Sequence, residues 1–176
     1  MQNYAYGTLT VRKITVIGLL VAVGAVAAPF SIPVGVAKVY PVQHAINVFT
    51  AVLFGPGPAV LAAFLTSTIR NMMGTGTPLA YPGSIFGALL AGLAYRYFKK
   101  DFIAAAGEII GTGILGALVA FPLAKWLLGF AGIAGAFIVP FFLSSLAGAV
   151  LGVLVLRIIL KTGVVTLDTV NKNMRL

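Results

Sequence analysis

Three side chains able to form hydrogen bonds, Gln43, His44 and Asn47, are spaced three and four residues apart in an otherwise apolar stretch of the sequence. In a helix this spacing places all three on one face. A membrane helix tolerates such a face only where a cavity or internal partners receive the polar groups, because unpaired polar groups are costly in lipid. We therefore expect these residues to line a ligand cavity, with an internal hydrogen-bond network as the alternative.

A second polar region, residues 70–84, lies between two apolar runs and is rich in glycine, threonine and proline. Its irregular backbone cannot face lipid, where unpaired N–H and C=O groups are costly, so it must cap or line a wet space. Arg70 ends an apolar run of about eleven residues, which spans about 18 Å of a hydrocarbon core about 30 Å thick. Arg70 should therefore lie below the membrane surface, where its guanidinium needs a partner, either a ligand or carbonyl groups of its own loop.

The composition indicates a polytopic membrane protein. Hydrophobic residues make up 60% of the 176 residues, charged residues make up 9%, and the mean hydropathy is +1.08. The net charge of +9 comes from basic residues scattered singly and in pairs, without a continuous stripe, so we expect no nucleic-acid partner. The chain has no cysteine, which excludes disulfides and thiolate metal sites.

We expect an all-α fold, a single transmembrane domain over residues 1–176 with six membrane-spanning helices. Proline, glycine and basic residues mark the ends of the apolar runs. The expected spans are residues 14–30, 41–54, 59–71, 83–97, 104–128 and 137–160. Nine of the twelve Lys and Arg residues then fall on the side of both termini, and Lys38, Arg70 and Lys125 fall on the other. The positive-inside rule places both termini in the cytoplasm and residues 70–84 on the outer side of a cell membrane.

Motifs of known catalytic or cofactor-binding chemistry are incomplete in this sequence. Residues 111–116 spell G-x-G-x-x-G, but they lie inside a membrane span, follow no strand, and have no acid about 20 residues later to bind a ribose. Residues 74–77 lack the lysine of a phosphate-binding P-loop. Pro82 stands where a G-x-S-x-G nucleophile turn needs glycine, and no base is placed for Ser84. We therefore expect neither enzyme activity nor a cofactor bound by this chain.

The chain has one histidine, His44, and one intramembrane acid, Glu108, which are too few for a metal site. Glu108 lies about one helical turn inside the cytoplasmic end of its expected span. We expect it to snorkel to the surface or to pair with Lys99 or Lys100. An acid at that depth is badly placed to couple an ion to solute movement, and this disfavours a stand-alone secondary carrier or channel, the alternative we keep.

The polar residues also form short motifs, which are densest between residues 41 and 92. In chain order these are Pro41-Val-Gln-His44 with Asn47, Gly55-Pro56, Thr66-Ser67, Arg70-Asn71, Gly74-Thr-Gly76-Thr77, and Tyr81-Pro-Gly-Ser84 with Gly87. In these motifs the sequence resembles the ThiW family, substrate-binding S components of energy-coupling factor (ECF) transporters. The resemblance implies a six-helix vitamin-uptake subunit that captures a thiamine precursor, hydroxyethylthiazole, on the outer side. It also implies partners, a transmembrane T subunit and two cytoplasmic ATPase subunits that use the ATP.

We expect seven residues to contact the substrate: Lys38, Gln43, His44, Asn47, Arg70, Asn71 and Tyr81. A neutral thiazole alcohol needs hydrogen bonds and an aromatic face, whereas its phosphorylated form would need Arg70 or Lys38 as a counter-charge. The sequence leaves both forms open. By the resemblance, small residues of the first helix would pack against the T subunit: Gly18, Ala22 and Ala25.

Overall fold

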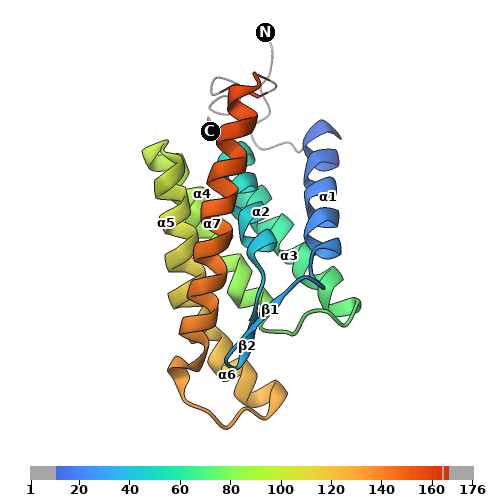
Figure 1. The fold of residues 1–176 in the computed structure, drawn as a ribbon, viewed down its shortest axis with the longest axis vertical. Helices are drawn as coiled ribbons and strands as arrows, with labels where there is room; N and C mark the ends of the chain where they lie inside the picture. The colour runs from blue at the N-terminus through green and yellow to red at the C-terminus, as the bar shows by residue number, and fades with distance from the viewer. Residues whose placement is uncertain (1–10, 164, 167–176) are drawn as a thin grey trace.

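The computed structural model describes residues 11–163, 165 and 166. Its elements are, in chain order, α1 (Val11–Val26), β1 (Ile32–Val34), β2 (Ala37–Val39), α2 (Pro41–Phe54), α3 (Pro56–Met72), α4 (Ala80–Phe98), α5 (Asp101–Ile110), the π-helical segment η1 (Gly111–Gly116), α6 (Ala117–Leu128), the 3₁₀ turn η2 (Ala134–Phe137) and α7 (Ile138–Lys161). Segments α5, η1 and α6 form one continuous helical run, Asp101–Leu128. The chain thus folds as a bundle of helices (Figure 1).

Helix α2 lies at the centre of this bundle. It packs against α3, α4 and α7, and α1 and α5 also contact it. Because neighbours surround it, ten of its fourteen residues are buried, among them Gln43, His44 and Asn47. The polar face expected from the sequence therefore points into the protein.

Small residues let the helices approach closely. One buried cluster consists of alanines from α2, α3 and α4: Ala51, Ala59, Ala63, Ala88 and Ala91. Gly92 of α4 faces the start of α3 so closely that an added Cβ would lie 2.4 Å from the Cα of Pro56. Apolar helices gain no hydrophobic free energy by associating in lipid, so a bundle there depends on close van der Waals contact of this kind.

The segment between α1 and α2 forms a two-stranded antiparallel hairpin, β1–β2, where the sequence predicted only a connection. Ile32 lies opposite Val39, and Gly35 occupies the turn with a φ of +57° that favours glycine. Helix α1 ends at Val26, before the predicted end at residue 30. The reason is Pro29, which has no N–H to extend the helical ladder and disfavours a helical conformation in the residue before it. The described residues are otherwise almost entirely helical or in short turns.

Among the described residues, two helical runs are long and apolar enough to cross a membrane, Asp101–Leu128 and Gly135–Lys161. Two shorter apolar helices are Lys13–Val26 and Pro41–Phe54. The 14 residues of Pro41–Phe54 rise about 21 Å, which is less than a hydrocarbon core of about 30 Å. Length and composition therefore support spanning for two helices, and the six-span arrangement stays a prediction.

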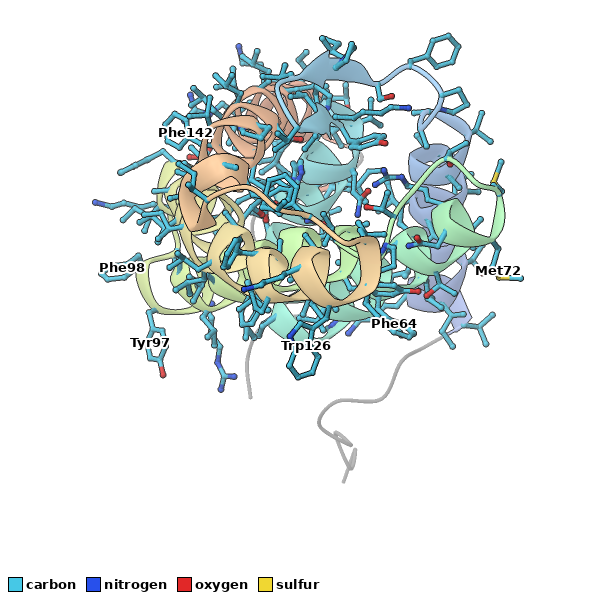
Figure 2. The ribbon with its side chains drawn as sticks, turned by 90° about the horizontal axis from the view of Figure 1, so that it is seen from below. Phe64, Met72, Tyr97, Phe98, Trp126 and Phe142 are labelled. Atoms are coloured by element: carbon cyan, nitrogen blue, oxygen red, sulfur yellow. The ribbon has the colours of Figure 1, made fainter. Side chains whose placement is uncertain are left out.

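Large apolar side chains point outward around the bundle. Figure 2 shows Phe64, Phe142 and Trp126 directed away from it, and Trp126 is 88% exposed. Further exposed apolar residues lie along α1 and α7, for example Leu19 and Leu154. Exposed apolar side chains in this number are unsuited to water and well suited to lipid.

The basic residues are distributed unequally between the two ends of the bundle. In Figure 1 the start of α1, the end of α4, the start of α5 and the end of α7 lie at the upper end, whereas the β1–β2 hairpin, α6 and the α3–α4 loop lie at the lower end. The upper end carries Lys13, Arg96, Lys99, Lys100, Arg157 and Lys161, and the lower end carries Lys38, Arg70 and Lys125. Lys172 and Arg175 lie outside the described residues, as does the side chain of Arg12. Asp101 accepts two hydrogen bonds from Arg157, at 2.6 and 3.0 Å, which joins α5 to α7.

Candidate functional site

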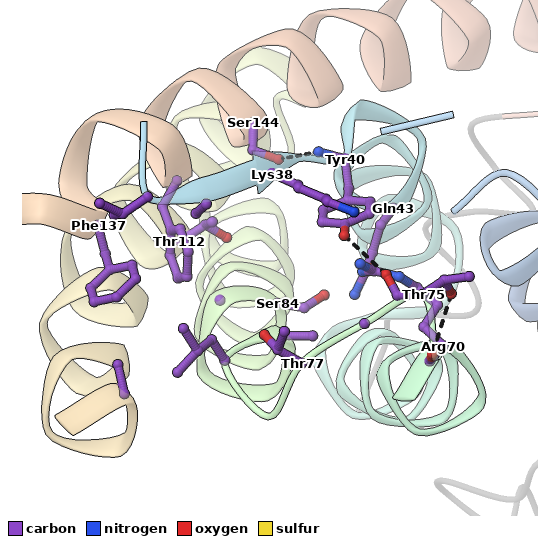
Figure 3. Close-up of a pocket in the computed structure, with 18 of the residues that line it drawn as sticks. Lys38, Tyr40, Gln43, Arg70, Thr75, Thr77, Ser84, Thr112, Phe137 and Ser144 are labelled. Carbon is purple, nitrogen blue, oxygen red and sulfur yellow. Dashed lines mark hydrogen bonds between the residues drawn. The ribbon is translucent and has the colours of Figure 1, made fainter. Parts of the chain in front are cut away.

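The described residues form a cavity of about 510 Å³, lined by elements that lie at the lower end of the bundle in Figure 1. Its wall is built from the β1–β2 hairpin, the starts of α2 and α4, the end of α3 with the following loop, η1, the end of α6 and the first half of α7 (Figure 3). This volume is typical of cavities that bind a small organic molecule. Parts of the chain that are far apart in sequence therefore meet around one potential ligand site.

Arg70 forms the wall of the cavity on one side. It lies in the last turn of α3 and is only 2% exposed. Its guanidinium carbon lies 3.6 Å from the centre of the Tyr40 ring, and its Nη1 donates a hydrogen bond to Gln43 Oε1. Its Nε is buried and has no hydrogen-bond partner. The partners that hold Arg70 in place are thus an aromatic face and a neutral amide.

The loop after α3 folds back on the end of that helix. The backbone N–H groups of Thr75 and Gly76 each donate to the Arg70 carbonyl at 3.0 Å. The Tyr40 hydroxyl donates to the Thr75 carbonyl at 3.0 Å, and the Tyr40 N–H donates to Ser144 Oγ at 2.7 Å. Tyr40 therefore ties the loop after α3 and the first half of α7 to the start of α2.

Glu108 lies behind the cavity wall in a buried hydrogen-bond network. It is 0% exposed, and its Oε1 lies 2.7 Å from His44 Nδ1. The same oxygen accepts hydrogen bonds from Asn47 Nδ2 at 3.0 Å and from Thr112 Oγ1 at 3.1 Å. Asn47 Nδ2 also lies 2.9 Å from Ser84 Oγ. One carboxylate oxygen thus holds α2 and η1 together, while Oε2 has no hydrogen-bond partner.

The predicted surface position of Glu108 beside Lys99 or Lys100 is wrong. Glu108 follows the first residue of α5 by seven positions, about 10 Å along the axis, and its face of the helix turns toward α2 and α4. Gly87 of α4 makes room for it, since a Cβ there would lie 2.6 Å from both carboxylate oxygens. Within the described residues, no third His, Cys, Asp or Glu joins the His44–Glu108 pair to make a metal-binding group.

The side of the cavity opposite Arg70 is aromatic. Figure 3 shows Phe137 on one side and Arg70 on the other, with Thr112 and Ser84 between them. Phe141 also lines the cavity, with its ring centre 6.0 Å from that of Phe137. The cavity therefore offers an apolar wall for a ring and polar groups for heteroatoms.

The structure separates the seven predicted substrate contacts into two groups. Lys38, Gln43, His44 and Arg70 line the cavity. The other three, Asn47, Asn71 and Tyr81, do not. Asn47 lies behind the wall in the Glu108 network, Asn71 donates to Ser67 O of its own helix at 2.8 Å, and the Tyr81 hydroxyl lies 3.2 Å from Thr68 Oγ1.

Several lining residues of α7 and its preceding turn were missed by the sequence analysis. Phe137, Phe141 and Ser144 recur at intervals of four and three residues, so they share one helical face. The same spacing that drew attention to α2 could have identified them. Thr112 was also missed as a lining residue, and only its position beside Glu108 reveals it.

The three predicted coupling residues of α1 do not share one environment. Gly18 and Ala22 are exposed on the outer side of the helix, and a Cβ on Gly18 would meet no atom within 4 Å. Ala25 is only 4% exposed. The inward side of α1 is formed instead by Ile17 and Val21, which pack on α3.

Substitution of Asn47 and of Asn71 should lower the stability of the protein by different amounts. Replacing Asn47 with Ala should lower the free energy of unfolding by about 1–3 kcal/mol, because Glu108 and Ser84 lose a buried donor. The matched variant Asn71→Ala removes a hydrogen bond within α3 and should lower the free energy of unfolding by a clearly smaller amount. Thermal unfolding of the purified proteins compares them. Equal losses would contradict the central place of Asn47 in the network.

An apolar helical bundle with a partly polar cavity among its described residues is typical of a membrane protein that binds a small molecule. A comparison with protein families makes this specific: the family model described as thiamine-precursor transporter protein (ThiW) matches residues 14–162. The chain belongs to the ThiW family, which confirms the resemblance found in its motifs. The searches of curated proteins and of solved structures gave no match.

Proposed function

We propose that this protein is the substrate-binding S component of an ECF-type uptake transporter and captures the thiazole half of thiamine, hydroxyethylthiazole. The observation that carries the proposal is the cavity of about 510 Å³ in a chain of a thiamine-precursor transporter family. Phe137 and Phe141 offer faces for the flat ring. His44, Ser84 and Thr112 offer hydrogen bonds to its heteroatoms and hydroxyl group.

We also propose that the energy for transport comes from partner subunits, a T subunit in the membrane and two cytoplasmic ATPases. The G-x-G-x-x-G segment supports this division of labour. Its first glycine packs so tightly that a Cβ on Gly111 would lie 2.4 Å from the Phe86 carbonyl oxygen, which leaves no space for a nucleotide there. In this proposal the chain binds no cofactor of its own and catalyses no reaction.

The proposed orientation places both termini in the cytoplasm and the cavity mouth outside. It is supported by the separation of basic residues, because six lie at the end opposite the cavity and three lie at the cavity end within the described side chains. A cavity that opens outward suits a subunit that captures solutes from the surroundings. The remaining helices would then complete a six-span, multi-pass bundle in the cell membrane.

The outer face of α1 is our proposed contact with the T subunit. Gly18 and Ala22 are exposed one turn apart, so another helix could approach the α1 backbone closely. Ala25 is buried in the bundle and is left out of this contact.

Uptake of labelled hydroxyethylthiazole tests the proposal. Cells that make this chain together with the T subunit and both ATPases should accumulate the label, and cells that make the chain alone should not. Gly18→Leu should abolish most uptake, since a loss of about 1.4 kcal/mol in association already reduces complex formation tenfold. Binding of hydroxyethylthiazole to the purified variant should be unchanged.

The matched control is Gly57→Leu, another glycine at which a Cβ would meet no atom within 4 Å, on α3. It should leave both uptake and binding close to those of the wild type. If Gly18→Leu and Gly57→Leu behave alike, α1 is not the coupling face. If the folded wild-type protein binds neither hydroxyethylthiazole nor its phosphate, the proposed substrate class is wrong.

The buried pair of Glu108 and His44 favours one second candidate, a stand-alone secondary carrier. The sequence argument against a carrier rested on a surface position for Glu108, whereas the structure places this acid 2.7 Å from a cavity-lining histidine. An ionisable pair beside a substrate cavity is typical of ion-coupled carriers. Uptake by the chain alone, abolished when the proton gradient is collapsed, would establish this function in place of the first.

A further inference from the structure

The charge around the cavity is unbalanced on the Arg70 side. Arg70 is buried and lines the cavity, yet no carboxylate pairs with it among the described residues. The hydrogen-bond acceptor that the structure gives its guanidinium is the neutral Gln43 amide. A cation removed from water is costly unless an anion or several acceptors compensate it. Arg70 therefore has an aromatic ring and a neutral acceptor as partners, but no anion, in the described part of the chain.

The loop after α3 does not supply the missing acceptors. Its Thr75 and Gly76 N–H groups point to the backbone carbonyl of Arg70, and its Thr75 carbonyl accepts the Tyr40 hydroxyl. The loop therefore satisfies the end of α3 and Tyr40 and contributes no recorded bond to the guanidinium. The sequence alternative, in which loop carbonyls neutralise Arg70, has no support in these contacts.

A second cation lies on the same side. Lys38 projects from β2 toward Tyr40 and Gln43 in Figure 3, and it lines the cavity without an ion-pair partner among the described residues. The acids of the described chain are engaged elsewhere: Glu108 by His44, and Asp101 by Arg157 at the other end of the bundle. The cavity thus presents two cations and, among the described residues, no lining carboxylate.

We propose that Arg70 and Lys38 form an anion subsite and that the ligand is a phosphate ester, with its ring on the Phe137 side. This inference rests on the proposed function and selects the phosphorylated thiazole over the free alcohol. A guanidinium and an ammonium together suit a phosphate, which accepts several charge-assisted hydrogen bonds. A neutral hydroxyl group would leave the buried Arg70 without an anionic partner.

Binding of the two forms to the purified full chain in detergent tests the subsite. Isothermal titration should give an affinity for the thiazole phosphate about 10- to 100-fold higher than for hydroxyethylthiazole, as charge-assisted hydrogen bonds imply. Arg70→Gln and Lys38→Gln should each remove most of this preference, because each weakens the binding of the thiazole phosphate and leaves that of the free alcohol unchanged. Lys38 is exposed, so its variant should fold even where Arg70→Gln does not.

The matched control is Lys125→Gln, which removes an exposed positive charge outside the cavity lining and should leave the preference unchanged. Equal or tighter binding of the free alcohol would overturn the anion subsite while the proposed function stands. A preference that survives in folded Lys38→Gln and Arg70→Gln would also overturn it. If neither form binds to the folded wild type, the proposed function itself fails.

Discussion

Replacing Glu108 with Ala should lower the free energy of unfolding by several kcal/mol, because each buried polar group left without a partner costs about 1–3 kcal/mol. Three groups lose their shared acceptor at once: His44 Nδ1, Asn47 Nδ2 and Thr112 Oγ1. The loss leaves buried donors unpaired between helices that are in direct contact. Ligand affinity should also fall, because His44 lines the cavity and is held in place by this carboxylate.

Two variants show whether the network causes this effect. Glu108→Gln keeps an acceptor oxygen for the same donors, so its loss of stability should be smaller than that of Glu108→Ala. The other acid in the described part of the chain is Asp101, which pairs with the exposed Arg157. The free energy of unfolding of Asp101→Ala should therefore remain close to that of the wild type. Unfolding of the purified proteins in detergent provides the comparison. If Asp101→Ala is as damaging as Glu108→Ala, the buried network does not stabilise the fold as proposed.

Gly148→Ala should be strongly damaging, although it adds only a single methyl group. A Cβ at Gly148 would lie 2.4 Å from the Pro41 carbonyl oxygen and 2.5 Å from His44 Cβ. Both atoms belong to α2 close to its backbone, so α2 and α7 would have to separate. Overpacking of this kind costs about 1–3 kcal/mol and outweighs the gain in helix propensity, which is at most about 1 kcal/mol.

The effect of Gly148→Ala should extend to ligand binding, since the displaced atoms include His44. Gly18→Ala is the matched control: it makes the same substitution within a helix where a Cβ meets nothing within 4 Å, and it should leave stability equal or slightly higher. Melting temperature and ligand affinity of the two variants are the measurements. A stable Gly148→Ala protein with wild-type affinity would show that α2 and α7 are not in such close contact.

The sequence predicted the helices well because their signals are local. The Gly55-Pro56 turn separates α2 from α3, and Pro41 occupies the first position of α2. The spacing of Gln43, His44 and Asn47 placed them on one face, which the structure buries. Of the two interpretations left open for that face, both apply: Gln43 and His44 line the cavity, while Asn47 belongs to an internal network.

The polar region at residues 70–84 was likewise predicted to line a wet space, and Gly74–Thr77 and Ser84 line the cavity. Its backbone was expected to be irregular throughout, whereas α3 continues to Met72 and α4 begins at Ala80, so the loop itself is shorter. One error arose where depth was inferred from distance along the chain. Glu108 was placed near the surface because it lies about one helical turn inside the end of its expected span, and the prediction ignored which side of its helix it occupies. Tyr81 and Asn71 were also predicted as ligand contacts; their side chains bond to α3 and lie outside the cavity lining, and their contact with a ligand stays a prediction.

The sequence by itself determined that this chain is a helical membrane protein with a polar face on one central helix and a polar loop beside it. Composition is a property of the whole chain, and helical periodicity depends only on residues a few positions apart. Both can therefore be identified without knowledge of the fold. Only the tertiary structure decided that Glu108 meets His44 across 64 positions of sequence, and that Phe137 and Phe141 form the far wall. These contacts depend on which helix faces meet, and that is set by close approaches at glycines such as Gly87 and Gly148.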